Sequence, residues 1–283
     1  MPAPLAATDT ISTFEAIVLG IAQGLTEFLP ISSSAHLRLV PAFAGWEDPG
    51  SAFTAVVQIG TMAAVLLYFR QDLWNMARAF LRTLTGDRPL WRTKDVDGKL
   101  GWYIVLGTIP ISIVGFALKD VIEDDFRHLE LVATVMILFS FVLYEADRRG
   151  RRTREVSELT LSDGLKIGVA QALALVPGVS RSGATISAGL LLGLTREAAT
   201  RYSFLLSVPA VVLSGLFELR KVSDGNLELW PTIVATVFAF ISGYLAIAWL
   251  LRYVRSHNFT VFVVYRVALG VVVLGLALGG VIS

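Results

Sequence analysis

Apolar runs long enough to cross a lipid bilayer recur along this chain and restrict its fold more than any other feature. A spanning helix needs about 20 predominantly apolar residues, with roughly 17 to 25 usual. Six continuous apolar runs meet or approach that length, at 53–69, 100–118, 129–144, 202–219, 230–251 and 259–281. Charged residues form only 17% of the sequence, whereas a soluble domain carries roughly 25%. We therefore expect an all-α integral membrane protein, with residues 1–283 in a single membrane domain.

Two further apolar stretches, 11–46 and 165–194, are each interrupted midway by helix-breaking and polar residues. The first interruption contains Pro30, Ser32, Ser33 and Ser34. The second contains Pro177, Gly178, Ser180, Arg181, Ser182 and Gly183. Proline ends or kinks a helix because it has no N–H and its ring clashes with the preceding turn. Each stretch is predicted to form a helix, a break and a second helix.

The two interrupted stretches resemble each other when one is laid on the other at an offset of 148 residues. The identical pairs are Gly20/Gly168, Ala22/Ala170, Gln23/Gln171, Leu25/Leu173, Ser32/Ser180 and Ser34/Ser182. Chance is an alternative, because Ala, Leu and Gly are common in membrane helices, but the Gln and Ser matches weigh against it. Residues 11–69 and 165–219 are therefore interpreted as repeat-related halves of one site.

Basic residues concentrate in two of the loops between the apolar runs. These are Arg70, Arg78, Arg82, Arg88, Arg92, Lys94 and Lys99 in the first loop, and Arg148, Arg149, Arg151, Arg152 and Arg154 in the second. Two spans separate the loops, so both lie on one side, which the positive-inside rule makes cytoplasmic. The opposite side receives only Lys119, Arg127, Arg220 and Lys221.

On this topology the two interrupted stretches enter the membrane from opposite sides and meet near its middle. The expected fold has six full transmembrane helices plus two re-entrant helix-break-helix hairpins, arranged as inverted-topology repeats. Residues 70–99 form a cytoplasmic amphipathic connection on the inner leaflet. Its apolar positions at helical spacing are Leu73, Ala77, Phe80, Leu81 and Leu84.

Composition excludes several classes of site and partner. The chain has no cysteine, which rules out disulfides, thiolate metal sites and cysteine nucleophiles. Residues 1–10 lack a basic region before a short apolar core, so no cleaved signal peptide is expected. Membrane lipids are expected partners and nucleic acid is not. A glycine row is compatible with a homodimer or with close packing inside one subunit, and consists of Gly270, Gly275, Gly279 and Gly280.

The polar residues of the two breaks carry the chemistry that the sequence suggests. Gln23 and Glu27 are four residues apart and share a helix face, and a carboxylate in a membrane segment is costly and usually functional. Arg181 lies among small residues ahead of a new helix, where backbone N–H groups and a guanidinium suit a phosphate. A structural Arg181–Glu27 ion pair is the alternative. Ser32 or Ser34 could likewise serve only as a helix cap.

His36 follows Ser33 by three residues and Ser32 by four, so a histidine and a hydroxyl can meet on one helical turn. Such a pair can supply a proton acceptor and a nucleophile, although this spacing alone is a weak signal. Together with Glu27 and Arg181 it outlines a site that cleaves a phosphate ester or anhydride inside a membrane. His128 and His257, at segment ends, are interpreted as interfacial.

Two motifs resemble those of the undecaprenyl-diphosphate phosphatase family of the bacitracin-resistance type. They are "QGLTEFLPISSSAH" at 23–36 and "PGVSRSGAT" at 177–185. Supporting stretches are "QIGTMAAVLLYF" at 58–69, "YSFLLSVPA" at 202–210 and "YR" at 265–266. The resemblance covers nearly the whole chain. It departs at position 23, where Gln offers no charge for a metal, and at position 35, where Ala replaces a frequent Gly.

The resemblance implies an enzyme of the bacterial plasma (inner) membrane that hydrolyses the C55 polyprenyl diphosphate to the monophosphate and inorganic phosphate. That reaction recycles the lipid carrier of cell-wall synthesis and confers bacitracin resistance. A divalent cation (Mg²⁺ or Ca²⁺) and a site opening to the outer, periplasmic face are also implied. The implied catalytic residues are Glu27, Ser33, His36 and Arg181, with Glu27 also the metal ligand. The implied substrate-binding residues are Gln23, Ser32, Ser180, Ser182 and Thr185.

Two questions stay open at this point. The first question is the mechanism. In one mechanism Ser33 attacks the terminal phosphorus and His36 moves protons. In the other, either His36 or Glu27 activates a water molecule, and Ser33 only orients the substrate. A lipid flippase or secondary transporter is the main alternative function, because inverted repeats with broken helices suit alternating access. A noncatalytic bacitracin-binding or scaffolding membrane protein is a third hypothesis.

Overall fold

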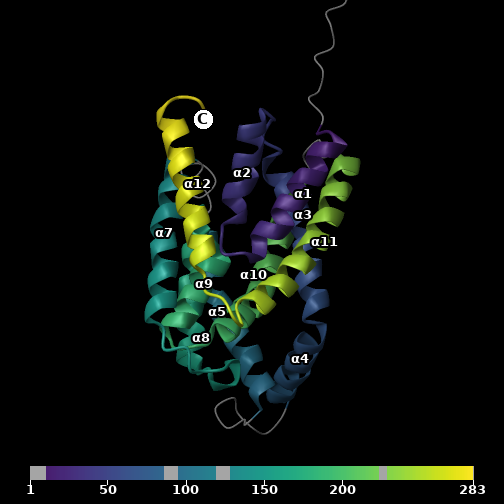
Figure 1. The fold of residues 1–283 in the computed structure, drawn as a ribbon. Coiled ribbons are helices and arrows are strands. Elements are labelled where there is room, and N and C mark those ends of the chain that lie inside the picture. The colour runs from purple at the N-terminus through teal and green to yellow at the C-terminus, as the bar shows by residue number, and fades with distance from the viewer. Residues whose placement is uncertain (1–10, 86–94, 119–127, 223–227, 283) are drawn as a thin grey trace, which may run out of the picture.

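The chain forms a bundle of helices, most of them aligned along one direction (Figure 1). A computed structural model describes residues 11–85, 95–118, 128–222 and 228–282, so the expectations for residues 1–10 and for Arg88, Arg92, Lys94, Lys119 and Arg127 fall outside it. The helices in the described ranges are α1 (Thr13–Phe28), α2 (Ser33–Ala44), α3 (Gly50–Tyr68), α4 (Arg70–Thr85), α5 (Val96–Ala117), α7 (Leu129–Arg149), α8 (Leu161–Ala172), α9 (Arg181–Leu191), α10 (Arg196–Val222), α11 (Leu229–Tyr253) and α12 (Thr260–Leu278).

Each of the six predicted apolar runs coincides with a helix, namely α3, α5, α7, α10, α11 or α12. Four of these helices, α5, α7, α11 and α12, are long and apolar enough to cross a membrane. A fifth crossing results if α3 and α4, which bend by 77° at their junction, count as one broken span. Within the described ranges there is no β-strand, and one isolated bridge pairs Arg154 with Leu194. The all-helical membrane architecture therefore agrees with the prediction.

Both interrupted stretches form a helix, a break and a second helix, as predicted. In the first, α1 ends at Phe28 and α2 begins at Ser33. In the second, α8 continues into a short 3₁₀ turn, η4 (Leu173–Leu175), and α9 begins at Arg181. Figure 1 shows α1 and α2 in the upper part of the bundle and α8 and α9 in the lower part. The two breaks thus approach each other in the middle of the molecule.

The backbone has the same unusual conformation at matched positions of the two breaks. Ser32 and Ser180, which the offset pairs, have φ angles of 75° and 71°, in the left-handed region that non-glycine residues seldom occupy. The helices that lead into the breaks also begin alike. Ser12 forms a capping box with Glu15, and Thr160 forms one with Asp163. These caps follow the same offset, so the match extends beyond the positions identified from the sequence.

Glycine allows the helices on either side of each break to pack closely. A Cβ on Gly20 of α1 would lie 2.3 Å from the Ala235 carbonyl oxygen of α11. A Cβ on Gly168 of α8 would lie 2.3 Å from the Gly107 carbonyl oxygen of α5. Small residues bring membrane helices into backbone contact in this way. Each half of the site therefore rests on a partner helix from elsewhere in the chain.

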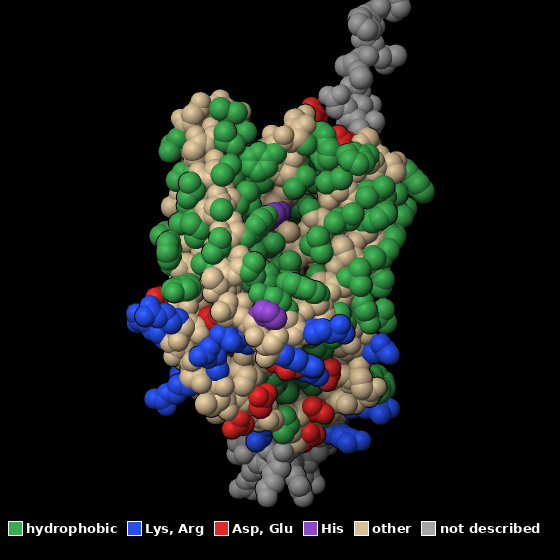
Figure 2. Space-filling model, in the orientation of Figure 1, with side chains coloured by type: hydrophobic (Ala, Val, Ile, Leu, Met, Phe, Trp, Pro, Cys, Tyr) green, Lys and Arg blue, Asp and Glu red, His purple; other side chains and the backbone are tan. Residues whose placement is uncertain are grey.

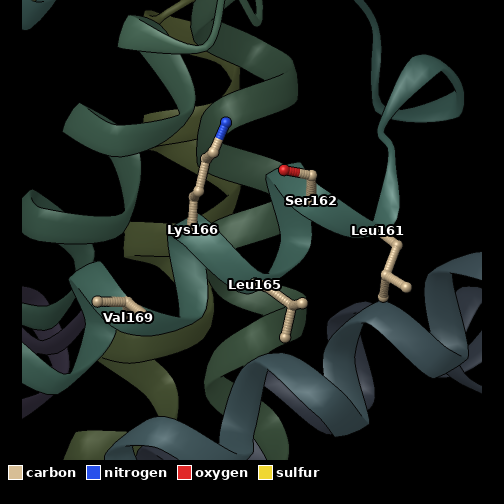
Figure 3. Close-up of a pocket in the computed structure, with 5 residues that line it drawn as sticks. All are labelled: Leu161, Ser162, Leu165, Lys166 and Val169. Atoms are coloured by element: carbon tan, nitrogen blue, oxygen red, sulfur yellow. The ribbon is translucent and has the colours of Figure 1, made fainter.

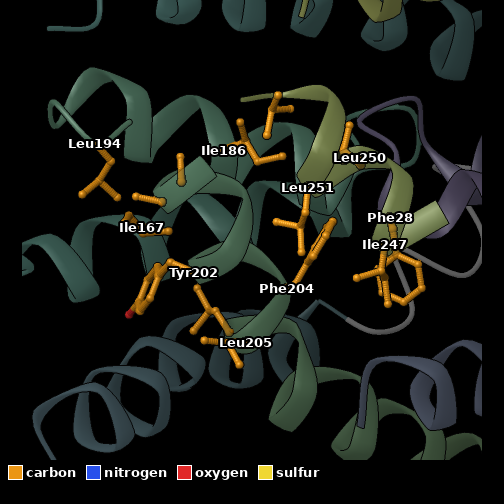
Figure 4. Packing of buried hydrophobic residues seen from close by; sticks show 14 of the residues in the cluster. Phe28, Ile167, Ile186, Leu194, Tyr202, Phe204, Leu205, Ile247, Leu250 and Leu251 are labelled. Carbon is orange, nitrogen blue, oxygen red and sulfur yellow. The ribbon is translucent and has the colours of Figure 1, made fainter. Parts of the chain in front are cut away.

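A continuous apolar core lies beside the breaks and fixes their position (Figure 4). Phe28, the last residue of α1, packs edge-to-face on Phe204 of α10 at a ring-centroid distance of 5.3 Å. Ile167 of α8, Ile186 of α9 and Ile247 of α11 are fully buried in the same cluster. Since these residues come from five helices, the core holds both hairpins against the same neighbours.

The face of the molecule shown in Figure 2 is largely apolar over its upper and middle parts, while charged side chains gather toward its lower end. Large apolar side chains such as Phe116, Leu229 and Leu245 are exposed on α5 and α11. Exposed apolar surface on this scale is expected where lipid, not water, covers the protein. The surface therefore supports the membrane assignment independently of the sequence.

The predicted amphipathic connection forms α4 over Arg70–Thr85, with 86–94 outside the described residues. One side of this helix packs against the protein. Met76 and Ala79 are buried, and Phe80 packs on Trp102 of α5 at a centroid distance of 4.8 Å. Leu81 and Leu84 are exposed. One side of α4 is therefore turned onto α5, and the predicted side is partly left open.

The close α1–α11 contact predicts a large effect for one added methyl group. Gly20→Ala should lower the free energy of unfolding by about 1–3 kcal/mol, because backbone atoms of α11 must move. Gly275→Ala on α12 is the matched control, since no atom lies within 4 Å of its added Cβ. Thermal unfolding in detergent measures both. Equal melting temperatures for the two variants would contradict the close contact between α1 and α11 at Gly20.

Candidate functional site

Glu27 is the centre of the polar cluster at the two breaks. Its Oε2 accepts hydrogen bonds from Ser33 Oγ at 2.6 Å and from Gln23 Nε2 at 3.1 Å. Its Oε1 forms an ion pair with Arg181 and accepts a longer hydrogen bond, 3.4 Å, from Gln58 Nε2. The Gln23 contact is the one that the four-residue spacing predicts. Both carboxylate oxygens are therefore engaged by donors from α1, α2, α3 and α9.

Ser33 and Arg181 occupy equivalent places, as the first residues of α2 and α9. Helix N-termini expose unpaired N–H groups and carry partial positive charge. Ser182 of α9 also donates to the Leu29 carbonyl of the first break at 3.1 Å. The tips of the two hairpins are thus in direct contact, and two helix N-termini converge on one carboxylate.

The serines around the tips pair in the same way in both halves. Ser32 Oγ lies 3.2 Å from Ser34 Oγ, and Ser180 Oγ lies 3.1 Å from Ser182 Oγ. Ser180 also caps α9 by accepting the Gly183 N–H at 3.2 Å. The side chain of Ser32 caps nothing in α2. The capping role considered for Ser32 is therefore not seen, although its counterpart Ser180 does cap a helix.

Thr185, predicted to bind substrate, is buried one turn into α9. Its Oγ1 lies 2.6 Å from Ser203 Oγ of α10 and donates to the Arg181 carbonyl at 2.8 Å. In this state the hydroxyl ties α9 to α10 and does not face Glu27. Its contact with the Arg181 carbonyl places it directly behind the guanidinium-bearing residue.

His36 is buried on α2, and both its ring nitrogens have partners. Nδ1 lies 2.7 Å from the Ser32 carbonyl oxygen, and Nε2 lies 2.7 Å from the Tyr265 hydroxyl of α12. The two rings are stacked at a centroid distance of 5.6 Å. The hydroxyl of Ser33 is hydrogen bonded to Glu27 instead of to His36. The predicted Ser–His contact is therefore absent from this state of the described chain.

Arg266 of α12 is fully buried and joins the two breaks. It donates to the Pro30 carbonyl of the first break at 3.1 Å and to the Gly178 carbonyl of the second at 2.8 Å. The Val179 and Met136 carbonyls accept further hydrogen bonds at 3.2 and 3.3 Å. Buried backbone carbonyls need donors. This guanidinium supplies them where the helices are interrupted.

The charges at the site leave an excess of positive charge. Glu27 and Arg181 offset each other, and Arg266 adds a second guanidinium. In the described chain, all hydrogen bonds of Arg266 go to backbone carbonyls. Two helix N-termini add partial positive charge at the same place. The cluster is therefore suited to bind an anion.

The more accessible residues of the cluster lie on α9 and α12. Glu27 is 8% exposed and His36 7%, whereas the Arg181 side chain is 17% exposed and Tyr265 44%. The depressions elsewhere on the surface lack these residues. One of about 500 Å³ lies along α8 and is lined by Leu161, Ser162, Leu165, Lys166 and Val169 (Figure 3). Another, of about 370 Å³, is lined by residues such as Arg152, Arg196 and Arg255.

Gln58, Tyr265 and Arg266 belong to the cluster but were not predicted as site residues. The cost of a charge inside a membrane segment, which singles out Glu27, applies equally to Arg266 in the run 259–281. The same argument, in weaker form, applies to the amide of Gln58. Tyr265 carries no comparable physical signal, because tyrosine is common near membrane surfaces; only the "YR" stretch of the family resemblance pointed to it.

Comparison with known proteins places the chain among named relatives. The family model described as bacitracin resistance protein BacA matches residues 16–272. A Nocardioides sp. protein named undecaprenyl-diphosphatase is 55% identical over 275 residues, covering 96% of this chain and 99% of that protein. Undecaprenyl-diphosphatase 3 of Frankia alni is 54% identical, covering 95% of this chain and 96% of the relative. Undecaprenyl-diphosphatase 2 of Streptomyces avermitilis is 49% identical, covering 96% and 97%.

Removing the guanidinium of Arg266 should destabilise the fold. Arg266→Met leaves the carbonyls of Pro30, Gly178 and Val179 buried without donors. Each unsatisfied carbonyl should lower the free energy of unfolding by about 1–3 kcal/mol. We expect loss of the monodisperse peak in detergent gel filtration, or a strongly lowered melting temperature. Arg252→Met, at an exposed position on α11, is the control and should behave as wild type. A stable Arg266→Met protein would contradict the bridging role.

Proposed function

Because the chain belongs to the bacitracin resistance protein BacA family, we propose that it hydrolyses undecaprenyl diphosphate to undecaprenyl phosphate and inorganic phosphate. The reaction recycles the lipid carrier of cell-wall synthesis and, by removing the target of bacitracin, confers resistance. The observation that carries the proposal is the contact of Glu27, Ser33 and Arg181 at the meeting point of two helix breaks. A carboxylate, a hydroxyl and a guanidinium within one polar cluster are what phosphoryl transfer needs.

The proposed topology has six transmembrane helices and two re-entrant hairpins that form inverted repeats. Its support is the offset of 148 residues, which relates the sequence motifs, the left-handed serines Ser32 and Ser180, and the two capping boxes. The first helix of each hairpin also packs closely on another long apolar helix, α1 on α11 and α8 on α5. Repeats of this kind commonly enclose a site near the middle of the membrane.

The proposed location is the bacterial inner membrane, with the site open to the outer, periplasmic face. The basic loops fall at the end of the bundle where charges gather in Figure 2, and positive charge favours the cytoplasmic side. The α1–α2 hairpin lies toward the opposite end (Figure 1). On this orientation α4 rests on the cytoplasmic leaflet, as the proposed amphipathic connection.

In the proposed binding mode, the diphosphate enters between the tips and competes with Glu27 for Arg181. The guanidinium suits two phosphate oxygens at once, and the N–H groups at the start of α9 add donors for the anion. Ser180 and Ser182 lie beside it, with Ser32 and Gln23 on the opposite hairpin. The ion pair with Glu27 is then the resting contact of Arg181. This reconciles the structural and the anion-binding interpretations of the residue.

In the proposed chemistry, Ser33 Oγ forms a bond to the terminal phosphorus while the bridging P–O bond breaks and undecaprenyl phosphate leaves. The hydroxyl proton passes to Glu27, which already accepts a hydrogen bond from Ser33 at 2.6 Å. Water then cleaves the phosphoserine, and His36 moves the protons of that step. In the alternative, Glu27 or His36 activates water and Ser33 only orients the substrate.

A divalent cation (Mg²⁺ or Ca²⁺) is part of the proposal. No three His, Asp or Glu side chains converge on a cation site within the described ranges. Gln23 Oε1, however, is buried beside Glu27 without a hydrogen-bond partner. Gln23 Oε1 and a carboxylate oxygen of Glu27 could together bind a cation whose other ligands are phosphate oxygens and water. Mg²⁺ is usually bound in this way at phosphate sites. When bound, the cation would offset the charge of the diphosphate.

Phosphate release by purified protein tests the function and its residues. In detergent, without any gradient, the wild type should release phosphate from a polyprenyl diphosphate, whereas a transporter or flippase would not. Arg181→Ala should lower kcat/KM by at least about 100-fold, because anion stabilisation is lost. Arg255→Ala removes a comparable Arg–Glu ion pair at the surface and should retain full activity.

Ser33→Ala separates the two chemical routes within that assay. Loss of turnover together with a trapped phosphoserine in the wild type supports attack by Ser33. A near-normal rate contradicts it and supports direct attack by water. Ser112→Ala on α5, whose hydroxyl bonds only to the Thr108 carbonyl in the described chain, is the control.

Single-cysteine labelling tests the proposed orientation, and the absence of native cysteine makes it direct. Glu47→Cys, between α2 and α3, should react with a membrane-impermeant maleimide in spheroplasts of an expressing bacterium. Arg151→Cys, in the basic loop after α7, should react only after permeabilisation. Both side chains are exposed. Reversed labelling of the two positions would overturn the outward-facing site.

A further inference from the structure

The environment of His36 specifies where its proton resides. A carbonyl oxygen only accepts hydrogen bonds, so Nδ1, at 2.7 Å from the Ser32 carbonyl, carries the hydrogen. In the neutral ring, Nε2 is then an acceptor. The donor at 2.7 Å from it is the hydroxyl of Tyr265. One contact fixes the tautomer, and the other occupies the only nitrogen able to take up a proton.

This arrangement separates His36 from Ser33. Ser33 Oγ donates to Glu27, and both nitrogens of His36 are already engaged. Any proton that reaches or leaves Nε2 in this state must therefore pass through the Tyr265 hydroxyl. A phenol can donate and accept at once, so it can carry out such an exchange.

We propose that Tyr265 is a further catalytic residue for the hydrolytic reaction: it fixes the imidazole of His36 and relays protons between His36 Nε2 and the attacking water. The inference rests on the proposed function and adds a group to it. Tyr265 is 44% exposed, whereas His36 is buried, so the tyrosine spans the distance from the imidazole to the accessible side. Its ring stacks on that of His36 with an interplanar angle of 11°, which further restricts the imidazole.

The proposed proton exchange leaves both side chains unchanged after a turnover. As water attacks phosphorus, the water proton passes to the Tyr265 oxygen and the Tyr265 proton passes to His36 Nε2. An imidazolium and an oxygen bonded to phosphorus result. As the bond from phosphorus to Ser33 Oγ breaks, Ser33 Oγ takes back the proton held by Glu27, and the imidazolium returns its own proton through Tyr265 to an oxygen of the released inorganic phosphate. Both rings end neutral, and no further reactant is needed.

The neighbouring residue holds Tyr265 in place. Arg266 is the next residue of α12 and is anchored to both breaks. The register of α12 against the two hairpins is therefore set by the arginine and does not depend on the tyrosine hydroxyl. Removing that hydroxyl should leave the fold intact, which makes Tyr265→Phe a clean test.

The experiment compares wild type, Tyr265→Phe and Tyr144→Phe in the phosphate-release assay over a range of pH. Tyr144 is exposed on α7, and in the described chain no hydrogen bond or ring contact joins it to a site residue. Tyr265→Phe should lower kcat by roughly 100-fold, the scale of general acid–base catalysis. Its KM should be unchanged, its melting temperature should match the wild type, and its pH–rate profile should change shape. Tyr144→Phe should match the wild type throughout.

Nitrogen NMR of histidine-labelled protein tests the contact without relying on activity. The chain has three histidines, so His36→Gln identifies the His36 signals by their loss. Tyr265→Phe should move the Nε2 resonance of His36, and Tyr144→Phe should not. An unmoved resonance, or wild-type kcat and pH profile in Tyr265→Phe, would overturn the inference. Absence of phosphate release by the wild type would instead refute the proposed function, and the resonance would still report on the contact.

Discussion

A helix that stops inside a membrane leaves backbone carbonyls without water to bind them, and this constraint governs the whole site. Arg266 satisfies it for both breaks at once, because its planar guanidinium carries several donors. The carbonyls of Pro30 and Gly178 belong to different hairpins, yet they bind the same side chain. The two interruptions are therefore stable only together. The cluster around Glu27 forms because the hydrogen bonds of Arg266 hold the two hairpin tips in contact.

Arg266 and its hydrogen bonds to both breaks also determine the net charge of the site. Burying Arg266 against carbonyl dipoles, with no carboxylate partner in the described chain, leaves the cluster with more positive than negative charge. Glu27 and Arg181 hold each other in the resting state, so an incoming anion has to draw Arg181 away from a carboxylate. That exchange lowers the net binding energy of the substrate. In the proposed mechanism it also releases Glu27 as bond-making begins, when a free carboxylate is most useful to take a proton.

The apolar runs and the prolines sufficed to predict the helices and both breaks, because these features depend on local sequence and on the membrane. The Gln23–Glu27 contact was equally local, being one helical turn. The contacts of Tyr265 and Arg266 could not be predicted in this way, since they join distant parts of the chain: His36 and Pro30 lie more than 200 residues before them, and Gly178 lies 88 residues before Arg266. The predicted pairing of His36 with a serine hydroxyl did not allow for the left-handed backbone at Ser32. There the carbonyl, not a hydroxyl, meets the imidazole.

The proposed repeat is symmetric in its backbone and asymmetric in its chemistry, and the asymmetry favours an enzyme over a transporter. At the repeat offset Ser33 corresponds to Arg181, and Glu27 corresponds to Leu175. The loss of the acid explains why Gln171, the counterpart of Gln23, is buried with neither amide atom hydrogen bonded in the described chain. Alternating access needs two halves that can exchange roles around one ligand. Here one tip supplies the acid, hydroxyl and imidazole, and the other supplies the guanidinium, a division that suits a fixed site for bond cleavage.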